Sequence, residues 1–376
     1  MREHDCDDER LAESPAPALS LLMPIYNMER YLPESLASAC AQTLSDFEIV
    51  CIDDGSTDGS AAVIDEFARR DDRIRVISKA NSGYGDSMNR GLTAARGVYI
   101  GILEPDDVLY PDSLRLLYDT ARRTDADIVK GNFDRYWARP RERVEFSEVV
   151  DAARCDAAVC PRKDPFIFYE QPSIWSAVYR RAFLEQAGIR FLPTPGASFQ
   201  DCSFAFKALA AADRVTYVHD AVLRYRQDNE GSSVHASDKV FCVCDEYAEV
   251  ERWIVRVFEP RHGSDEAARL LRIAQVAKYD SYLWSYVRLA PEYREMFLTR
   301  MAREFAHAID RGWFALDDLK PWKRANLEAI MCDPAAWVRR NAAYAGAGPA
   351  GRAWHYLRLG GLGLLAAYAR DRLRHG

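Results

Sequence analysis

Three carboxylates crowd into four residues near position 105, directly after an apolar run. Glu104, Asp106 and Asp107 form the motif EPDD, and residues 99–103 precede it as YIGIL. Carboxylates this close repel one another unless a cation neutralises them. A hard divalent ion, Mn²⁺ or Mg²⁺, would do so and would keep coordination positions open for diphosphate oxygens. The alternative is a turn whose acids favour the N-terminal end of a helix that begins near Asp112.

A second acidic motif, DDGSTDG, occupies residues 53–59 and also follows an apolar run. Asp53 and Asp54 can accept hydrogen bonds from a nucleotide base or a ribose hydroxyl. The alternative is a strand-to-helix turn in which Gly55 supplies a positive φ and Asp58 caps the next helix. Two adjacent acids are more than such a turn requires, so the motif indicates a nucleotide site.

A glycine-rich turn and a late acidic residue complete the set of candidates. Asn81 and Gly83 stand in the motif NSGYGD, where glycine allows the backbone to approach a ligand closely. Gln200 and Asp201 open an apolar helical run, where Asp201 is either a general base or a helix cap. The first apolar run ends in PIYN, residues 24–27, and not in a glycine-rich fingerprint, which argues against a nicotinamide-binding fold.

The elements that must position these groups alternate between strand and helix from Leu19 onward. This rhythm predicts an α/β fold with a Rossmann-like, mostly parallel sheet flanked by helices. The carboxyl ends of parallel strands meet at one edge, so the acidic motifs and the glycine-rich turn are expected together there. Strands are expected over 19–26, 47–53, 74–78, 98–103 and 127–132, with helices over 31–42, 58–70, 87–96 and 112–123.

The second half of the chain is first irregular and then helical. Prolines interrupt the pattern beyond Arg135, which predicts loops and short helices over the sheet, followed by short strands at 214–218 and 221–226. From about Asp238 aromatic and leucine residues recur at helical spacing, which predicts a separate all-α module. The expected organisation is a flexible leader (1–18), a catalytic domain (19–235) and a C-terminal helical domain (236–376).

Charge and cysteine content narrow the partners and the compartment. The formal net charge of −7 argues against nucleic acid as a partner, because nucleic-acid-binding surfaces carry a basic stripe. The chain has 9 cysteines, an odd number without a CxxC pair, which favours a reducing, cytoplasmic location over a disulfide framework. Residues 1–18 lack the apolar core of a signal peptide, and no apolar run reaches the length that crosses a bilayer.

The last segment, residues 353–376, combines aromatic and leucine side chains with several arginines. One interpretation is a basic amphipathic helix that makes peripheral contact with the inner face of the cell membrane. The other is a helix packed on its own domain with a solvated arginine face. The helical module as a whole is expected to present an acceptor, to pair subunits in a homodimer, or to brace the core.

Taken together, these motifs resemble the inverting family 2 glycosyltransferases, which have the GT-A fold. The resemblance spans about Leu19 to Ser233, and the motifs recur in the family's order and at its separations. The matching segments are 24–27, 29–32, 42–43, 47–49, 53–58, 81 with 83, 89–91, 97 with 99–100, and 104–107.

The resemblance implies that the first half of the chain binds a nucleotide sugar. Asp53 and Asp54 would contact the base and the ribose, and Arg90 would lie near the base. The other residues that would line the nucleotide pocket are Pro24, Tyr26, Glu29, Asn81 and Gly83.

The resemblance also places the family's metal-binding motif on residues 104–107. Glu104 stands where the family more often has Asp, so Asp106 and Asp107 are the stronger expected ligands for Mn²⁺ or Mg²⁺. Arg226 matches a late segment that closes over the diphosphate. Many relatives carry a metal-binding His two residues after that arginine, where this chain has Asp228.

On the acceptor side, the resemblance implies that Asp201 is the general base. Trp175 and Gln200 would lie along the acceptor wall. The implied reaction is metal-dependent transfer of a sugar, with inversion, to a hydroxyl of a glycan or lipid-linked acceptor, and UDP is the expected nucleotide.

Polysaccharide biosynthesis is the role that analogy suggests. Two rival functions share part of this pattern. A sugar nucleotidyltransferase would need a glycine-rich loop with Arg or Lys after the first strand, which this chain lacks. A non-catalytic relative that serves as a binding or scaffold subunit is left open by the motifs.

Overall fold

A single mixed sheet organises the first part of the computed structural model, which describes residues 16–155, 157–229, 239–341 and 348–375. Ten strands pair in the order β3-β2-β1-β4-β9-β6-β10-β5, with β7 on β6 and β8 on β10. The strands are β1 (Leu19–Ile25), β2 (Phe47–Asp53), β3 (Ile74–Ser78), β4 (Tyr99–Ile102), β5 (Val108–Leu109), β6 (Ile128–Trp137), β7 (Arg143–Ser147), β8 (Ala158–Val159), β9 (Ala177–Arg180) and β10 (Val215–Arg226).

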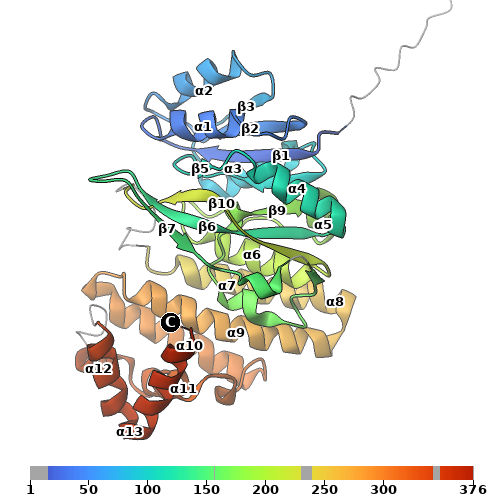
Figure 1. The fold of residues 1–376 in the computed structure, drawn as a ribbon. Coiled ribbons are helices and arrows are strands. Elements are labelled where there is room, and N and C mark those ends of the chain that lie inside the picture. Colours follow the sequence, from blue (N-terminus) through green and yellow to red (C-terminus); the bar gives the residue numbers. More distant parts are fainter. Residues whose placement is uncertain (1–15, 156, 230–238, 342–347, 376) are drawn as a thin grey trace, which may run out of the picture.

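Helices connect the strands and then continue as a helical part below the sheet in Figure 1. Those of the sheet part are α1 (Leu32–Cys40), α2 (Ser60–Ala68), α3 (Tyr84–Ala94), α4 (Ser113–Thr124), α5 (Arg181–Gln186) and α6 (Gln200–Ala211). Those of the helical part are α7 (Cys242–Trp253), α8 (Glu259–His262), α9 (Ser264–Tyr286), α10 (Arg294–Asp310), α11 (Pro321–Cys332), α12 (Pro334–Arg340) and α13 (Pro349–His375). The predicted α/β class with a C-terminal helical region is therefore confirmed.

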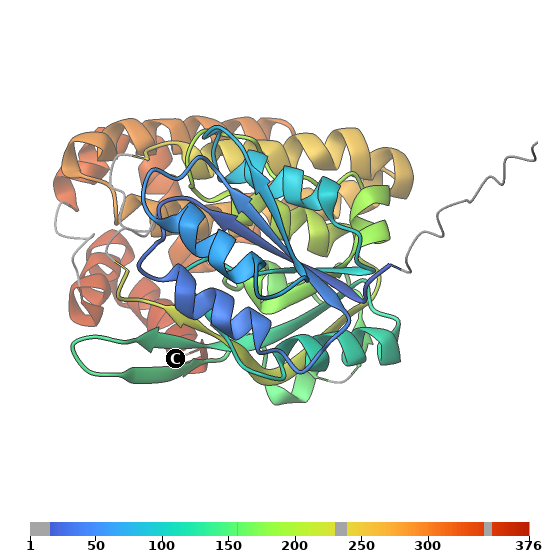
Figure 2. The same ribbon diagram turned by 90° about the horizontal axis from the view of Figure 1, so that it is seen from above.

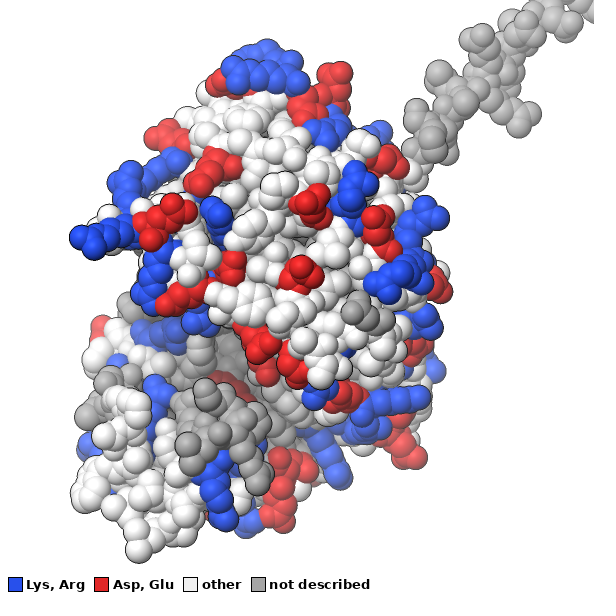
Figure 3. Space-filling view, viewed as in Figure 1, with Lys and Arg blue, Asp and Glu red and all other residues white. Residues whose placement is uncertain are grey.

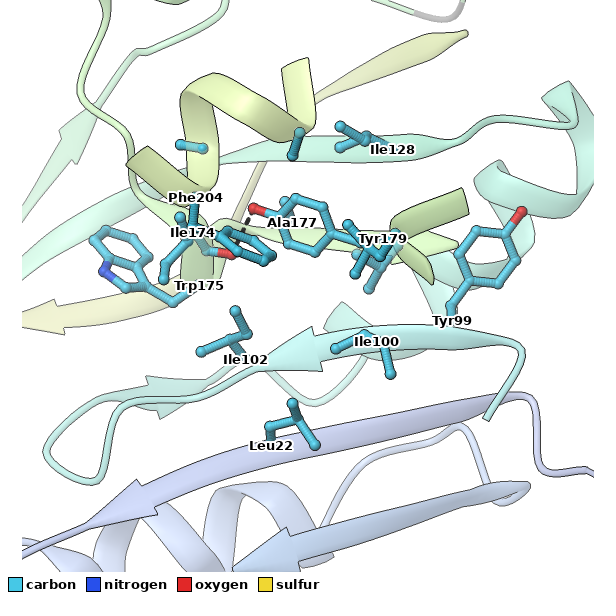
Figure 4. Packing of buried hydrophobic residues seen from close by; sticks show 14 of the residues in the cluster. Leu22, Tyr99, Ile100, Ile102, Ile128, Ile174, Trp175, Ala177, Tyr179 and Phe204 are labelled. Carbon is cyan, nitrogen blue, oxygen red and sulfur yellow. Dashed lines mark hydrogen bonds between the residues drawn. The ribbon is translucent and has the colours of Figure 1, made fainter. Parts of the chain in front are cut away.

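The strands β1 and β2 are buried along their whole length, as parallel strands covered on both faces must be. They pair in parallel with each other, and β1 also pairs in parallel with β4. Ile100 and Ile102 of β4 lie between Leu22 of β1 and Tyr179 of the neighbouring strand β9 (Figure 4). This apolar packing fixes where each strand ends, and so fixes the loops that carry the acidic motifs.

The region beyond Arg135 is more regular than its prolines predict. β6 runs on to Trp137 and pairs with β7, where loops were expected. β9 enters the sheet antiparallel to both β4 and β6, and its four residues gave no periodic signal. β10 is one strand with register shifts after Tyr217, where two short strands were predicted. Pairing across long sequence separations decides β9 and β10, which local patterns cannot report, whereas β6 and β7 form a local hairpin.

The helical part packs directly on the sheet part. Trp253 and Phe258 belong to the same apolar cluster as the strands, so the expected separate module shares a core with its neighbour. A second cluster lies within the helical part and includes Tyr282 and Phe305. Figure 2 shows these helices extending along one side of the sheet. The predicted boundary at 235/236 and the leader's residues 1–15 lie outside the described residues, so both remain predictions.

The last helix, α13, kinks at Gly360 and Gly361. Its Tyr356 and Tyr368 are buried and meet Trp322 of α11 edge-to-face. None of the described helices has the length and apolarity that crossing a bilayer requires. The helix thus packs on its own domain, and a peripheral membrane contact stays a prediction.

Candidate active site

The loop after β3 is held by the carboxylate of Asp54 at the end of β2. One Asp54 oxygen accepts from the backbone N–H of Ser82 at 2.8 Å, and the other accepts from that of Gly83 at 2.9 Å. Lys79 donates to the same carboxylate and forms a buried ion pair with it. Asp54, a predicted nucleotide ligand, follows β2 at its carboxyl end. Its carboxylate therefore also holds the glycine-rich turn in place.

The loops after β1 and β2 are also tied together by hydrogen bonds. Asp53 is buried and accepts from the backbone N–H of Ser56 at 3.0 Å. Glu29 accepts from the N–H of Gly59 at 2.5 Å, while its own N–H donates to Asp58 at 3.1 Å. These bonds bring the predicted residues Asp53 and Glu29 into one rigid frame at the carboxyl ends of the strands.

The remaining residues predicted for the nucleotide pocket differ in exposure. Pro24 is buried at the end of β1, whereas Tyr26 just after it is 46% exposed. Asn81 is exposed on the turn before α3. Arg90 lies on the exposed face of α3 and donates to Asp86 at 2.9 Å, one turn earlier. Tyr26 and Asn81 are therefore free to contact a ligand, and Arg90 would have to leave Asp86 to do so.

Gly83 joins the nucleotide side of the site to the loop before α6. Its φ of 97° lies in the region that glycine tolerates best. A Cβ at this position would lie 2.8 Å from the backbone nitrogen of Gly196 and 2.8 Å from the backbone oxygen of Thr194. The N–H of Tyr84 donates to the carbonyl of Gly196 at 3.0 Å. This close approach draws residues 194–201 against the start of α3.

The three acids after β4 each have a specific partner. Tyr84 donates its hydroxyl to Glu104 at 2.7 Å, and Asn229 donates its side-chain amide to Asp106 at 2.7 Å. One oxygen of Asp107 accepts from the N–H of Arg226 at 2.8 Å. The other Asp107 oxygen is buried with no hydrogen-bond partner among the described residues.

Burial removes the water that would stabilise these three carboxylates in their ionised form. It raises the pKa of Glu104 to about 8, with Asp106 and Asp201 adding to the rise. Burial also raises the pKa of Asp106, and it raises that of Asp107 well above the usual range. A raised pKa means that ionising the carboxyl costs more free energy than in water. A cation bound nearby lowers that cost.

The acids fit a divalent ion that takes only part of its shell from the protein. No three His, Cys, Asp or Glu side chains of the described residues converge closely enough to hold an ion by themselves. Mg²⁺ and its relatives typically use one or two carboxylates together with substrate phosphates and water. The orphaned oxygen of Asp107 is the observation in favour of such an ion, because a buried carboxylate oxygen is costly to leave without a partner.

Arg226 lies behind the acids and is almost fully buried. Its guanidinium donates to the carbonyl of Asp106 at 2.8 Å and to the carboxylate of Glu34 at 2.5 Å. Asp228 accepts from the backbone N–H groups of Ala138 and Arg139, at 3.0 and 2.9 Å. Arg226 therefore fixes the acidic loop, and Asp228 holds the start of the loop between β6 and β7.

Asp201 stands in the first turn of α6, beside the acidic cluster. Burial raises its pKa, and its charge in turn raises the pKa of Glu104. A second carboxyl, Glu246 of α7, is buried against Ser203 of α6, where burial raises its pKa to about 8 and Asp201 adds to the rise. Asp201 lies 94 positions after Asp107 in the sequence. The fold nevertheless brings both residues into the same electrostatic environment.

Two residues predicted for the acceptor wall are buried. Gln200 accepts from the N–H of Ser198 and donates to the Thr194 hydroxyl at 2.9 Å, so it shapes the loop before α6. Trp175 is stacked on Tyr225, with ring centroids 4.7 Å apart and planes at 24°. Both side chains therefore pack against other residues of the protein, and their contact with an acceptor remains a prediction.

Sequence reasoning did not single out several residues that organise this site. Lys79, Tyr84 and Asn229 each bond an acidic site residue, yet each is a common polar residue in a loop or at a helix start. Only Tyr84 lay in a motif already noted, the glycine-rich turn. Glu34 and Glu246 had no local signal, because their partners lie far along the chain.

Comparisons with known proteins agree with this architecture. The family model described as Glycosyl transferase family 2 matches residues 20–184. EpsJ, an uncharacterised glycosyltransferase of Bacillus subtilis, is 31% identical over 217 residues, which are 56% of this chain and 62% of that protein. EpsH, a putative glycosyltransferase of the same organism, is 31% identical over 56% of this chain and 61% of that protein. The matched region thus spans about three fifths of these relatives.

A likeness to solved structures extends over more of the chain. The crystal structure of residues 1–349 of TarS from S. aureus, in complex with UDP-GlcNAc, superposes with a TM-score of 0.67 at 19% identity. The superposition covers 84% of this chain and 87% of the TarS chain. At this identity the likeness shows a common fold, which includes much of the helical part.

Proposed function

We propose that this chain transfers a sugar from a nucleoside-diphosphate sugar to an acceptor hydroxyl, because residues 20–184 match the family model of the family 2 glycosyl transferases and the fold superposes on that of TarS. The nucleotide we propose is UDP, the nucleotide in the TarS complex. The acceptor is a glycan or a lipid-linked glycan, and the role is polysaccharide biosynthesis in the cytoplasm. The observation that carries the proposal is the group of acids after β4, Glu104, Asp106 and Asp107, where Asp107 has a buried oxygen without a partner among the described residues and Asp201 adds to the raised pKa of Glu104.

The nucleoside would bind along the loops after β1, β2 and β3. Asp53 and Asp54 are held in place by backbone bonds, so they are positioned before a ligand arrives. Tyr26 is exposed at the end of β1 and offers a ring face to a base. The diphosphate would then reach the acids after β4, where Asp106 and Asp107 would hold Mn²⁺ or Mg²⁺.

A bound divalent ion would supply electrostatic stabilisation of the leaving diphosphate. Asp201 would remove the proton from the acceptor hydroxyl, and a raised pKa makes its carboxylate a stronger base. The hydroxyl would then attack the anomeric carbon from the face opposite the leaving group, which inverts configuration. Arg226 would act by fixing the acidic loop through the Asp106 carbonyl.

The test is release of UDP from a panel of UDP sugars, with and without Mn²⁺. A transferase gives metal-dependent release that rises when a suitable acceptor glycan is added. A non-catalytic subunit binds the nucleotide without releasing it from any donor, and that outcome would overturn the proposal.

A further inference from the structure

Helix α9 of the helical part reaches the turn that precedes the proposed base. Trp284, near the C-terminal end of α9, meets Phe199 edge-to-face, with ring centroids 5.8 Å apart. Phe199 holds a φ of 61°, which is rare for a bulky residue, and it stands two positions before Asp201. The helical part therefore contacts the backbone that positions Asp201.

Arg288 lies one turn beyond Trp284 and stacks on it. The guanidinium carbon is 3.3 Å from the centroid of the Trp284 ring, and the guanidinium donates to the Trp284 carbonyl at 2.9 Å. Both side chains are exposed, Trp284 at 41%. A stacked guanidinium is held in one orientation, so it loses little freedom when it binds an anion.

The pair lies on the acceptor side of the site. Trp284 contacts Phe199, and Phe199 precedes the Gln200–Asp201 start of α6. The stacking of Arg288 on Trp284 therefore places its guanidinium near the turn that leads into Asp201.

Arg288 forms no ion pair with any carboxylate of the described residues, although many arginines of the helical part do. Arg252 pairs with Glu249 at 2.9 Å, and Arg300 pairs with Asp245 at 2.7 Å. An arginine beside an acidic site would gain a carboxylate partner cheaply, because carboxylates are common there. Within the described part of the chain its guanidinium therefore has no counter-charge, and a guanidinium in this state suits an anionic group of a ligand.

We propose that Trp284 and Arg288 form an acceptor subsite that selects a sugar bearing an anionic group, either a phosphate or a carboxylate. The apolar face of the sugar ring would pack on Trp284, and the anionic group would bind Arg288. The acids after β4 would repel the anionic group of the acceptor. Binding to Arg288 would therefore orient the acceptor with its anionic group away from those acids. This subsite rests on the proposed function and names its acceptor class.

The test compares three probes on the full chain in the presence of UDP and Mn²⁺. The probes are N-acetylglucosamine 1-phosphate, glucuronic acid and neutral N-acetylglucosamine, and their dissociation constants are measured by ligand-observed NMR. At least one anionic probe is expected to bind about 10-fold more tightly than the neutral one, the effect of one charge-assisted contact. The two anionic probes distinguish a phosphate-bearing from a carboxylate-bearing acceptor.

In Arg288→Gln the ratio of the dissociation constants for the neutral and the anionic probe is expected to fall to about one, while the affinity for UDP stays unchanged. Arg311→Gln is the matched control, because Arg311 also stacks on a tryptophan of the helical part, Trp313, at 4.8 Å. The control should keep the preference. Trp284→Phe, which retains a ring against Phe199, should weaken the binding of all three probes by a similar factor.

Equal affinities for the three probes in the unaltered chain would overturn the subsite, as would an unchanged preference in Arg288→Gln. Either result leaves the proposed function standing if UDP still binds and is released from a donor. Failure of the unaltered chain to bind UDP would overturn the proposed function and the subsite together.

Discussion

Two acidic regions lie along the same edge of the sheet, and the fold treats them in opposite ways. After β2, both oxygens of Asp54 accept backbone hydrogen bonds and Lys79 neutralises the charge. After β4, Glu104 and Asp107 keep raised pKa values, and Asp107 has an oxygen without a partner in the described chain. The protein itself supplies the hydrogen bonds and the counter-charge of the first region. The carboxylates of the second region need a cation from outside the protein.

The difference separates positioning from chemistry. A nucleoside presents neutral hydroxyls and ring nitrogens, so acids that bind it gain from being fixed in advance. A diphosphate with its ion brings both signs of charge, so the acids that meet it must stay uncompensated until it arrives. Basic and acidic side chains are interspersed on the face shown in Figure 3, so these local contacts, and not a broad surface field, would handle the ligand's charge.

The largest expected effect comes from Asp201, which belongs to the uncompensated side of the comparison. Asp201→Asn should lower turnover by about 10²- to 10⁴-fold, since the amide cannot accept the acceptor's proton. Release of UDP from a donor sugar in the presence of acceptor measures the loss, and UDP affinity should be nearly unchanged. Turnover within twofold of the unaltered chain would remove Asp201 from the role of base.

The next effect tests the self-satisfied region. Asp54→Asn should lower the free energy of unfolding by about 2 kcal/mol, because it removes the closer of the two carboxylates that pair with the buried Lys79 and leaves only Asp86, at 3.2 Å. Urea denaturation measures this change. Asp53→Asn is the control and should cost about 1 kcal/mol, since it weakens a single bond to the N–H of Ser56. Equal costs would show that the ion pair adds nothing.

Removing an acid from the uncompensated region should have the opposite sign. Asp107→Asn should raise the free energy of unfolding of the metal-free protein by about 1 kcal/mol at pH 8, because repulsion from Asp106 and Glu104 is relieved. The stabilisation that Mn²⁺ with UDP gives the unaltered chain should shrink at the same time. A metal-free variant less stable than the unaltered chain would contradict the contrast between the two regions.

The smallest effect concerns acid stability on the nucleotide side. Hydrogen bonds from Ser82 and the side chain of Arg90 lower the pKa of Asp86 to about 2 in the folded state. A lowered folded-state pKa gives stability above about pH 4 that is lost as the pH falls towards 2. Because the side chain of Asp86 is 31% exposed and its partner Arg90 is 53% exposed, solvent screens the charges and the contribution should stay under about 1 kcal/mol. Asp86→Asn should therefore be less stable than the unaltered chain at pH 6 and nearly equal to it at pH 2.5, by urea denaturation.

The early strands could be predicted because each carries its own signal. The sequence predicts the strands 47–53 and 74–78 with the bounds that the structure has. The first is a largely apolar run, as a strand buried on both faces needs, and the second, which is only partly buried, is rich in β-branched residues. The start of α3 was placed three residues late, at Ser87, because Tyr84 begins the helix through contacts with Glu104 and Gly196. Those contacts depend on the fold and have no trace in local periodicity.

The candidate site could be predicted in its residue types and less well in their partners. Asp53 ends β2 and Asp54 follows it, as their motif indicated, whereas Asp201 lies in the first turn of α6. Gln200 is buried and holds the loop before α6, so its predicted contact with an acceptor stays a prediction. The motif gave its position, and only the folded loop decided the direction of its side chain.

What the sequence determined by itself was the order of the elements, the edge at which the acids gather and the kind of ligand they suit. These follow from apolar periodicity and from residue type, which act over a few neighbouring positions. The tertiary structure alone decided that Lys79 neutralises Asp54, that Asp107 keeps an unpartnered oxygen, and that Trp284 and Arg288 stand beside the site. Charge compensation depends on distance in space, and the folded chain brings together residues that its sequence keeps far apart.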